Sequence, residues 1–318
     1  MEEKMGKLTI AALDALQLID IDWTPLEELG SVTKYDATAP ELIIERAKDA
    51  DVVLVNKVKM TRDVLQQLPK LKYIGVLATG YNIVDIAAAK ELGIVVTNIP
   101  AYSTDSVAQL VFALLLEITH HVGHHNAAVQ AGHWSNNADF CFWDYPLTEL
   151  AGKTMGVVGY GRIGRRVGEI ARAFGMNVLA YTRTPRDPEC VSLDELLAKS
   201  DVISLHCPLF PETKQLINRE TIAKMKDGAI LINTSRGPVV DDDALAEALK
   251  SGKLYAVASD VAAIEPIPAD NPLLGLENMI FTPHFGWATA EARVRLMDIS
   301  VANVKAFIEG NPVNVVNK

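Results

Sequence analysis

The sequence predicts an α/β protein built from two doubly wound parallel sheets. Short apolar runs alternate with amphipathic segments along nearly the whole chain, which is the pattern of parallel strands joined by covering helices. Near the middle of the chain an apolar run, a glycine-rich turn and a helical segment follow one another. The length of 318 residues is enough for two domains with sizeable cores.

The first hundred residues are expected to form one sheet covered by helices. Pro40 suits a first helical turn, and Gly93 suits the end of a helix. This block has no phosphate-binding glycine loop, so it predicts only a flavodoxin-like α/β layer. The expected strands are Lys7–Ala11, Val32–Tyr35, Val52–Asn56, Tyr73–Leu77 and Ile94–Thr97, and the expected helices are Pro40–Lys48, Thr61–Leu68 and Val84–Leu92.

Gly159, Gly161 and Gly164 have the G-x-G-x-x-G spacing of a dinucleotide-binding turn. The first glycine allows a tight turn, the second lets the backbone approach a pyrophosphate, and the third lets the helix pack on the strand. Arg162 and Ile163 complete the loop, whose free N–H groups would face the negative charge. The spacing alone also occurs by chance, but here a strand precedes it and a helix follows. We therefore expect a Rossmann cofactor domain.

Further elements extend this pattern to the end of the chain. A long helix is expected over Thr104–Ala131, ended by Gly132; its middle is apolar nearly all round and is expected to be buried between domains or subunits. Ser192-Leu-Asp-Glu195 predicts a capping box, and Asp241 is expected to cap the helix that runs through Lys250. The other expected elements are strands Met155–Val158, Asn177–Tyr181, Asp201–His206, Ala229–Asn233, Tyr255–Ser259 and Met279–Thr282, and helices Arg162–Phe174 and Thr289–Glu309.

Pro100 interrupts secondary structure between the two blocks and marks a crossing point between domains. We expect a discontinuous substrate domain formed by residues 1–100 and 287–318. Residues 101–286 are expected to form a dinucleotide-binding domain inserted into it. The fold class is thus a Rossmann cofactor domain inserted in a flavodoxin-like substrate domain.

Composition excludes several classes of partner. The formal net charge is −10 and the chain has no basic stripe, which argues against nucleic acid or an anionic membrane as a partner. Three scattered cysteines, Cys141, Cys190 and Cys207, suggest no disulfide framework and favour a cytoplasmic setting. The histidines of His120–His125 lack an obvious cysteine or acid to complete a metal site, so we expect no metal and place them on a helix surface or an interface.

Polar residues follow the strands of the second half at one sheet edge. In an open α/β sheet, ligands bind beyond the carboxyl ends of the strands. The glycine loop and four other strand ends therefore deliver their side chains to the same edge. The residues concerned are His206, Cys207 and Pro208, then Thr234, Ser235, Arg236 and Gly237, then Asp260 and His284.

Three of the residues near this edge are candidates for the chemistry. Arg236 presents a planar fork that can grip a carboxylate in two places, although an ion pair that holds the loop is the alternative. His284 is a natural proton donor near neutral pH, although a packed loop histidine is equally compatible with its position. Glu265 lies in a loop that leaves the same edge and can orient His284 and favour its charged form. Together they suggest hydride transfer coupled to proton transfer.

The end of the second Rossmann strand bears on the choice of cofactor. An NAD site normally carries Asp or Glu about 20 residues beyond the glycines, where it bonds the ribose hydroxyls. Thr182 stands there in this chain, and Arg183 and Thr184 follow it. The missing acid removes repulsion against a 2′-phosphate, and Arg183 can pair with that phosphate. Asp187 is nearby, but Pro185 obscures its direction. We favour NADP(H), with NAD(H) or the use of both as the alternative.

The chain resembles the D-2-hydroxyacid dehydrogenase family, and within it the glycerate dehydrogenase/hydroxypyruvate reductase branch. The likeness covers nearly the whole chain in the same order, and its motifs together are highly specific. The segment from Trp287 resembles the glycerate branch more than the lactate or phosphoglycerate branches. The motifs are Ala78–Asp85, Val158–Gly164, Ile232–Asp241, Asp260–Pro266 and Thr282–Thr289.

The resemblance implies a set of roles. Arg236, Glu265 and His284 would be the catalytic set. The loop from Leu77 through Ala78, Thr79 and Gly80 would offer backbone N–H groups to the substrate carboxylate, with Tyr102 near the substrate. Asp260 and Gly286 would hold the nicotinamide amide, and Pro208 and Thr213 would flank the cofactor. Gln109 stands where family members usually carry Glu.

The expected activity is reduction of hydroxypyruvate to D-glycerate, with glyoxylate as a second substrate and a homodimer as the assembly. Formate or phosphite oxidation is possible on this scaffold, but formate enzymes lack an acid where this chain has Glu265. From another class, the same fold serves as a nucleotide-sensing corepressor that binds partner peptides. The acidic charge and the absence of appended tails count against that alternative.

Overall fold

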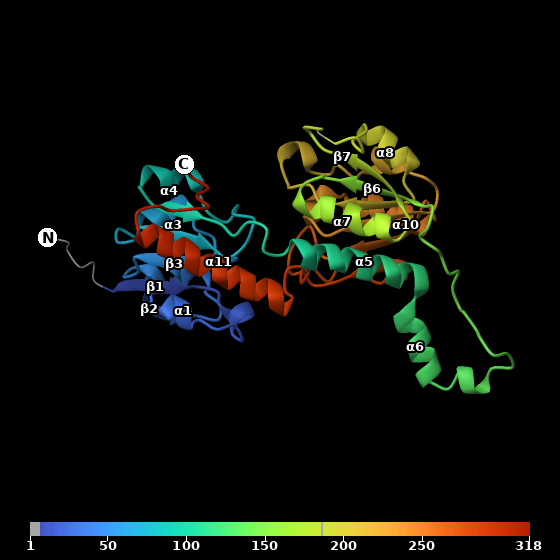
Figure 1. The fold of residues 1–318 in the computed structure, drawn as a ribbon, viewed down its shortest axis with the longest axis horizontal. Helices are drawn as coiled ribbons and strands as arrows, with labels where there is room; N and C mark the ends of the chain where they lie inside the picture. Colours follow the sequence, from blue (N-terminus) through green and yellow to red (C-terminus); the bar gives the residue numbers. More distant parts are fainter. Residues whose placement is uncertain (1–6, 186) are drawn as a thin grey trace. The chain divides into compact units, whose positions relative to one another are not determined.

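The computed structural model describes residues 7–185 and 187–318, and these form two compact units. Unit 1 comprises the described residues up to Ser103 together with Ala288–Lys318, and unit 2 comprises Thr104–Trp287. Each unit has one parallel sheet with helices packed against it (Figure 1). The predicted class, two α/β domains with parallel sheets, is confirmed.

Unit 1 contains a five-stranded sheet in the order β2-β1-β3-β4-β5, with every pair parallel. Its central strands are buried along their whole length, as expected for a parallel sheet covered on both faces. The strands are β1 Leu8–Ala12, β2 Gly30–Lys34, β3 Val52–Val55, β4 Tyr73–Val76 and β5 Val95–Thr97, and the α-helices are α1 Thr24–Glu27, α2 Ile43–Ala47, α3 Arg62–Gln66, α4 Ile86–Glu91 and α11 Ala290–Ile308, with 3₁₀ turns at Leu16–Leu18 and Pro40–Leu42.

Unit 2 contains a six-stranded parallel sheet in the order β11-β10-β9-β8-β6-β7. The strands are β6 Thr154–Val158, β7 Asn177–Tyr181, β8 Val202–Leu205, β9 Ala229–Asn233, β10 Leu254–Ser259 and β11 Met279–Phe281. The α-helices are α5 Thr104–His120, α6 Val122–Gln130, α7 Arg162–Ala173, α8 Leu193–Lys199, α9 Arg219–Ala223 and α10 Asp242–Lys250, with 3₁₀ turns at Trp134–Asn136, Pro211–Thr213 and Gly237–Val239.

Both sheets begin with the same strand arrangement, in which the first strand lies between the second and the third. The strand order therefore reverses between β1 and β3 in unit 1 and between β6 and β8 in unit 2. Such a switch point opens a crevice outside the carboxyl ends of the two strands, which is where doubly wound sheets bind ligands.

The amino ends of the two sheets carry the same hydrogen-bonded clamp. In unit 1 the carboxylate of Asp51 accepts from the Thr9 N–H at 3.1 Å and from Lys72 Nζ at 3.0 Å. In unit 2 the carboxylate of Asp201 accepts from the Thr154 N–H at 2.8 Å and from Lys226 Nζ at 2.9 Å. The clamp ties the first strand of each sheet to the third at the end opposite the switch-point crevice.

The prediction of one continuous helix over Thr104–Ala131 is wrong in one respect. The chain leaves the helical conformation at His121 and forms two helices. His121 has a φ of 47°, in the left-handed region, and separates α5 from α6. The rings of His121 and Tyr145 stack with centroids 4.3 Å apart, a tertiary contact that helical periodicity does not encode. Helix α6 leads away from the sheet of unit 2 (Figure 1).

No single helix among the described residues is long and apolar enough to cross a membrane.

The histidines that follow α5 organise the segment after α6. His124 Nε2 lies 2.7 Å from Asp144 Oδ2, and the N–H of Asp144 donates to His125 Nε2 at 3.2 Å. His133 stacks on Phe142 with ring centroids 4.3 Å apart. Among the described residues no group of three or more His, Cys, Asp or Glu is placed to hold a metal ion. The cluster therefore has a structural use within unit 2.

The predicted capping box at Ser192 forms only in part. The Ser192 side chain accepts from the Glu195 N–H, but the Glu195 carboxylate pairs with Lys199 instead of returning to the cap. Asp241 caps α10 as expected, accepting from the Ala244 N–H at 3.1 Å.

Candidate active site

The glycine loop lies at the switch point of unit 2. Gly159 has a φ of 97°, and a Cβ placed on it would lie 2.5 Å from the backbone nitrogen of Cys207 after β8. A Cβ on Gly164 would lie 2.2 Å from the carbonyl oxygen of Gly159. Gly161, in contrast, faces open space with no atom within 4 Å of an added Cβ. Two glycines thus serve chain packing, and the middle one leaves room for a ligand.

The start of helix α7 offers unpaired donors at this crevice. Gly161 is the N-cap residue, and no side chain among the described residues accepts a hydrogen bond from the N–H groups of the first turn. The first N–H groups of an α-helix have no partner within the helix, so they are available to an anion. Further along the same edge, the Thr234 Oγ1 atom is buried without a hydrogen-bond partner in the described part of the chain. An orphaned hydroxyl and an open glycine cradle both fit a bound dinucleotide.

The loops after β7 and β8 meet at an arginine–aromatic contact. The guanidinium of Arg183 lies 4.8 Å from the ring centroid of Phe210, and both side chains are exposed. In the loop after β7, Thr182 is half-buried and Thr184 is exposed. In the loop after β8, Thr213 Oγ1 donates to the Pro208 carbonyl at 2.7 Å, which closes that loop.

Asp187, whose direction the sequence leaves open, points at Arg165 in α7. Two hydrogen bonds join the guanidinium to the carboxylate, of 2.5 and 2.6 Å. Arg165 in turn lies 4.9 Å from the ring centroid of Tyr160 in the glycine loop. The acid closest in sequence to the expected ribose position is thus engaged by a cation.

Hydrogen bonds join the ends of β9, β10 and β11 into one edge. The Asp260 N–H donates to the Asn233 carbonyl at 2.9 Å, and the Thr282 N–H donates to the Ser259 carbonyl at 3.0 Å. Thr282 Oγ1 donates to Asp260 Oδ1 at 2.6 Å. The loops that carry Arg236, Glu265 and His284 therefore all leave from neighbouring, linked strand ends.

His284 is paired with Glu265. The distance from His284 Nδ1 to Glu265 Oε2 is 2.7 Å, and both side chains are about one-third exposed, at 28% and 34%. Glu265 Oε1 also accepts from the Ala262 N–H at 3.2 Å, which fixes the second oxygen. Because Nδ1 faces the carboxylate, Nε2 is the nitrogen left to face a substrate.

The backbone of His284 is held in a strained conformation. Its φ of 53° lies in the left-handed region, which residues other than glycine rarely adopt. Asp260 stabilises the turn by accepting from the Phe285 N–H at 3.0 Å and the Gly286 N–H at 2.8 Å. Burial raises the pKa of Asp260, because desolvation outweighs the hydrogen bonds that its carboxylate accepts. Keeping the Asp260 carboxylate ionised here therefore costs free energy, and its hydrogen bonds hold the turn that positions His284.

Arg236 leaves from a turn that Asn233 organises. The Asn233 amide oxygen accepts from the Ser235 N–H at 3.0 Å and its Nδ2 donates to the Arg236 carbonyl at 3.0 Å. A Cβ on Gly237 would lie 2.0 Å from the carbonyl of Ala262, so this turn packs directly against the loop that carries Glu265. The half-buried Arg236 guanidinium uses one nitrogen, Nη1, to donate to the Ser235 carbonyl at 2.7 Å.

Two other titratable groups at this edge stay neutral near pH 7. Burial lowers the pKa of His206 to about 3, and its Nε2 lies 2.8 Å from Ser204 Oγ. Burial raises the pKa of the Cys207 thiol to about 11. Neither residue is therefore a cationic proton donor near pH 7.

The remaining predicted residues belong to unit 1. The N–H groups of Ala78, Thr79 and Gly80, just after β4, donate to no partner among the described residues. The Thr79 hydroxyl donates to the Ile99 carbonyl at 2.9 Å, which holds this loop in place. Tyr102 is buried, and its carbonyl accepts from Arg295 Nε at 2.9 Å.

Sequence reasoning missed several residues that support the site. Asn233 is buried and builds the Arg236 turn, and the Asn-Thr-Ser order after a strand is a signal for such a turn. Ser106 in α5 donates to the Gly286 carbonyl at 2.5 Å, although 180 residues separate the two, and no local pattern announces that contact. Both backbone groups of Gly286 are thereby engaged within unit 2.

Comparison with known proteins identifies the family. A model of the NAD-binding domain of D-isomer specific 2-hydroxyacid dehydrogenases matches residues 112–286. A hydroxypyruvate reductase of Blautia hydrogenotrophica is 56% identical over 308 residues, 94% of this chain and 96% of the relative. A glycerate dehydrogenase of Methylorubrum extorquens is 45% identical over 287 residues, 89% and 91% of the two chains. The structure of D-lactate dehydrogenase from Aquifex aeolicus, complexed with NAD and lactic acid, matches with a TM-score of 0.84 at 34% identity, covering 98% of this chain and 99% of that one.

The chain belongs to the D-isomer specific 2-hydroxyacid dehydrogenase family. Within that family it falls in the glycerate dehydrogenase and hydroxypyruvate reductase branch, as the sequence motifs predict. The prediction of an enzyme that uses a nicotinamide cofactor is confirmed, and the nucleotide-sensing alternative is not favoured.

A matched pair of glycine substitutions tests the cradle. Gly161→Ala should leave the melting temperature unchanged, since an added Cβ meets no protein atom, but should weaken binding of the reduced cofactor by about tenfold or more because the Cβ fills the ligand's space. Gly159→Ala should instead destabilise the fold, because its Cβ meets backbone. Calorimetric binding and thermal melts separate the two effects. Undiminished cofactor affinity in Gly161→Ala would show that the pyrophosphate binds elsewhere.

Proposed function

We propose that this protein reduces hydroxypyruvate to D-glycerate, with glyoxylate as a second substrate. The observation that carries the proposal is the His284–Glu265 pair, 2.7 Å apart, at a sheet edge shared with Arg236 and the glycine cradle. The similarity to a hydroxypyruvate reductase and a glycerate dehydrogenase supports this substrate.

Each residue of the set has a defined task. Arg236 binds the carboxylate of the 2-oxo acid through its planar fork. The bound reduced nicotinamide supplies a hydride to C2. His284 holds a proton at Nε2 and donates it to the carbonyl oxygen as negative charge builds there, which completes the 2-hydroxy acid. Glu265 orients the imidazole through Nδ1 and stabilises its charged form until the proton leaves.

Unit 1 contributes donors to the same substrate in this proposal. The N–H groups of Ala78, Thr79 and Gly80 bind the substrate carboxylate, and Tyr102 lies near the substrate. The support is that these N–H groups have no partner among the described residues and that the Thr79 hydroxyl fixes their loop. Asp260 and Gly286 are proposed to hold the nicotinamide amide through their oxygen atoms, because a carboxylate or carbonyl oxygen that already accepts one hydrogen bond can accept a second.

Substitutions of the pair test the proton donor. His284→Ala should lower kcat for hydroxypyruvate reduction by about 10²–10⁴-fold, because the developing oxyanion loses its proton source. Glu265→Gln keeps an acceptor for Nδ1 but removes the charge, so kcat should fall by a smaller factor. Stopped-flow loss of nicotinamide absorbance measures both. A His284→Ala enzyme with nearly full activity would remove this residue from the mechanism.

We also propose that the preferred cofactor is NADP(H). The loop after β7 carries the exposed guanidinium of Arg183, and the carboxylate of Asp187 is engaged by Arg165. A 2′-phosphate bound here would therefore be attracted by the Arg183 guanidinium, and its repulsion by Asp187 would be offset by Arg165. The other expected contacts of the cofactor are Thr182 and Thr184 at the ribose, and Cys207, Pro208, Thr213, Thr234 and Ser235 along the neighbouring strand ends.

The kinetic constants of both cofactors test this preference. Arg183→Ala should lower kcat/KM for NADPH by about tenfold, the size of one lost charge-assisted hydrogen bond, and change that for NADH by less than about twofold. Arg219→Ala, which removes an exposed arginine on α9 paired with Glu247, is the control. An intact enzyme that prefers NADH more than tenfold would refute the proposal.

We propose further that the protein is a homodimer that works in a reducing cytoplasm, where its three free cysteines stay reduced.

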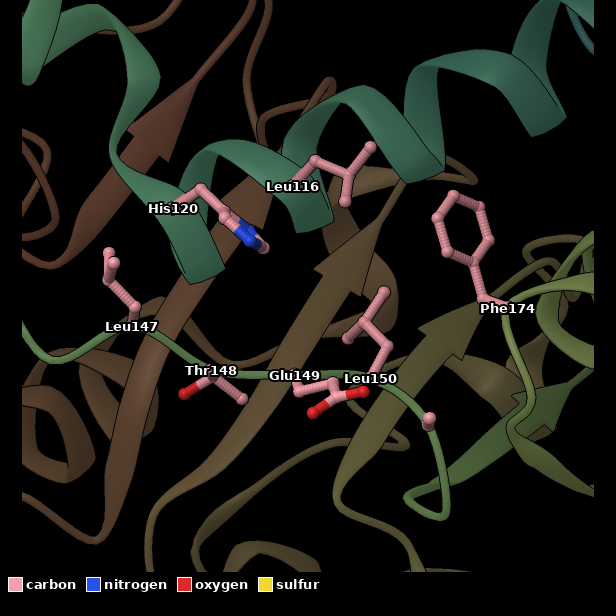
Figure 2. Close-up of a pocket in the computed structure, with 8 residues that line it drawn as sticks. Leu116, His120, Leu147, Thr148, Glu149, Leu150 and Phe174 are labelled. Atoms are coloured by element: carbon pink, nitrogen blue, oxygen red, sulfur yellow. The ribbon is translucent and has the colours of Figure 1, made fainter.

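Unit 2 exposes an unusual run of large apolar side chains after α6, with Phe140 82% and Trp143 62% exposed. A hollow of about 430 Å³ lies on unit 2 and is lined by Leu116, Leu147 and Phe174 among others (Figure 2). Its residues precede β6 and β7 or lie on α5, so it is at the edge opposite the active site. A neighbouring hollow contains Gln109.

Light scattering after size exclusion tests the dimer. The wild type should elute at twice the chain mass of 34.6 kDa, because exposed apolar patches of this kind usually mark interfaces. The double substitution Phe140→Ser and Trp143→Ser should give monomers. Ile19→Ser, which removes another exposed apolar residue, from unit 1, should leave the mass unchanged. A monomeric wild type would contradict the proposal.

A further inference from the structure

The switch point of unit 1 is occupied by a side chain of the protein. Asp14 follows β1, and its carboxylate accepts three backbone hydrogen bonds from the loop after β3. The Asn56 N–H donates at 2.7 Å and the Val58 N–H at 3.0 Å, and the Lys57 N–H donates between them. The three successive N–H groups form the kind of concave donor set that binds anions.

The same position is used differently in the two units. In unit 2 the crevice between the first and third strands contains the glycine cradle, which leaves room for a phosphate group. In unit 1 the Asp14 carboxylate occupies that position, so the N–H groups of the loop after β3 have an internal acceptor. A substrate anion in unit 1 must therefore bind one strand further along, after β4.

The loop held by Asp14 runs beside the loop proposed to bind the substrate. At one end, the Leu77 N–H donates to the Val55 carbonyl at 2.7 Å. At the other, the Met60 N–H donates to the Ile83 carbonyl at 2.8 Å. These bonds fix the segments 56–59 and 78–82 next to each other. On the far side, Asn98 Nδ2 donates to the Thr79 carbonyl at 2.8 Å. The substrate-binding loop thus lies between two flanking segments, and Asp14 holds one of them.

The placement of Asp14 costs free energy. Burial raises its pKa, because desolvation of the carboxylate outweighs the three N–H bonds and the nearby Lys57 charge. Asp51 shows that these strands can be tied together by a carboxylate that is paired with Lys72 and whose pKa is lowered. A half-buried carboxylate with a raised pKa on the opposite edge indicates a task beyond joining β1 to β3.

We propose that Asp14 is a positioning residue that fixes the segment 56–59 against the Ala78–Gly80 loop and thereby sets the affinity of unit 1 for the 2-oxo acid. The inference rests on the proposed function, because it takes this loop to bind the substrate carboxylate. Asp14 acts through the backbone and does not touch the substrate.

Steady-state kinetics of Asp14→Asn and Asp14→Ala test this role. Asn replaces one acceptor oxygen with a donor that opposes a backbone N–H, and Ala removes all three bonds. We expect KM for hydroxypyruvate to rise by up to about tenfold, more in Ala than in Asn, with kcat and KM for the reduced cofactor within about twofold of wild type. Asp51→Asn is the matched control, since it removes a carboxylate from the opposite ends of the same two strands. It should lower the melting temperature without changing KM.

Limited proteolysis gives a readout that does not depend on activity. Trypsin should cut after Lys57 faster in Asp14→Ala than in wild type or Asp51→Asn, because the loop has lost its anchor. The proposal is overturned if both Asp14 variants keep the wild-type KM, if Asp51→Asn raises KM equally, or if cleavage is unchanged. Should the wild type reduce no 2-oxo acid at all, the proposed function fails, and the cleavage rates alone decide whether Asp14 holds the loop.

Discussion

The hydrogen bonds of the Asp260 carboxylate are the interactions on which the arrangement of the candidate active site depends. The carboxylate accepts hydrogen bonds from Thr282 Oγ1 and from the N–H groups of Phe285 and Gly286, while the Asp260 N–H is bonded to Asn233. These bonds link three strand ends and hold His284 in a left-handed conformation that it would not adopt alone. The pairing of His284 with Glu265 is possible because this turn is fixed.

The two units illustrate how one topology serves two tasks. Both contain a first strand between the second and third, and both carry an aspartate clamp at the amino end of those strands. At the carboxyl end they differ. Unit 2 has glycine at the switch point and keeps its crevice open, whereas unit 1 has Asp14 there and satisfies the N–H groups internally. The presence of the Asp14 side chain in unit 1, where unit 2 has glycine, therefore separates a filled switch point from an open crevice.

Much of the fold follows from local sequence pattern. The strands Asn177–Tyr181 and Ala229–Asn233 have the predicted bounds, because short apolar runs between turn residues leave little alternative. The break at His121 was not predictable, because helical periodicity continues through it and the stacking of His121 on Tyr145 is a tertiary contact. The short helices α1 and α9 were missed because their four and five residues span little more than one turn, so no apolar spacing repeats along them.

Candidate site residues could be predicted where a reactive side chain directly follows a strand. Contacts between residues far apart in the sequence could not be predicted in this way. Arg236 and His284 are selected by their positions after apolar strands, because ligands bind beyond the carboxyl ends of such strands. The structure adds the bond between His284 and Glu265. The Arg165–Asp187 pair and the Ser106–Gly286 bond join residues whose proximity only the folded chain creates. The orphaned Thr234 hydroxyl likewise emerges only when all its neighbours are in place.

The central claim is that this edge delivers a hydride to C2 of a 2-oxo acid while His284 supplies the proton. Its most direct measurement uses reduced cofactor carrying deuterium at C4 of the nicotinamide, with hydroxypyruvate as acceptor, and NMR of the product. The account predicts D-glycerate with deuterium at C2 when the transferable position is labelled. Glycerate without that deuterium, or product of the L configuration, would contradict it.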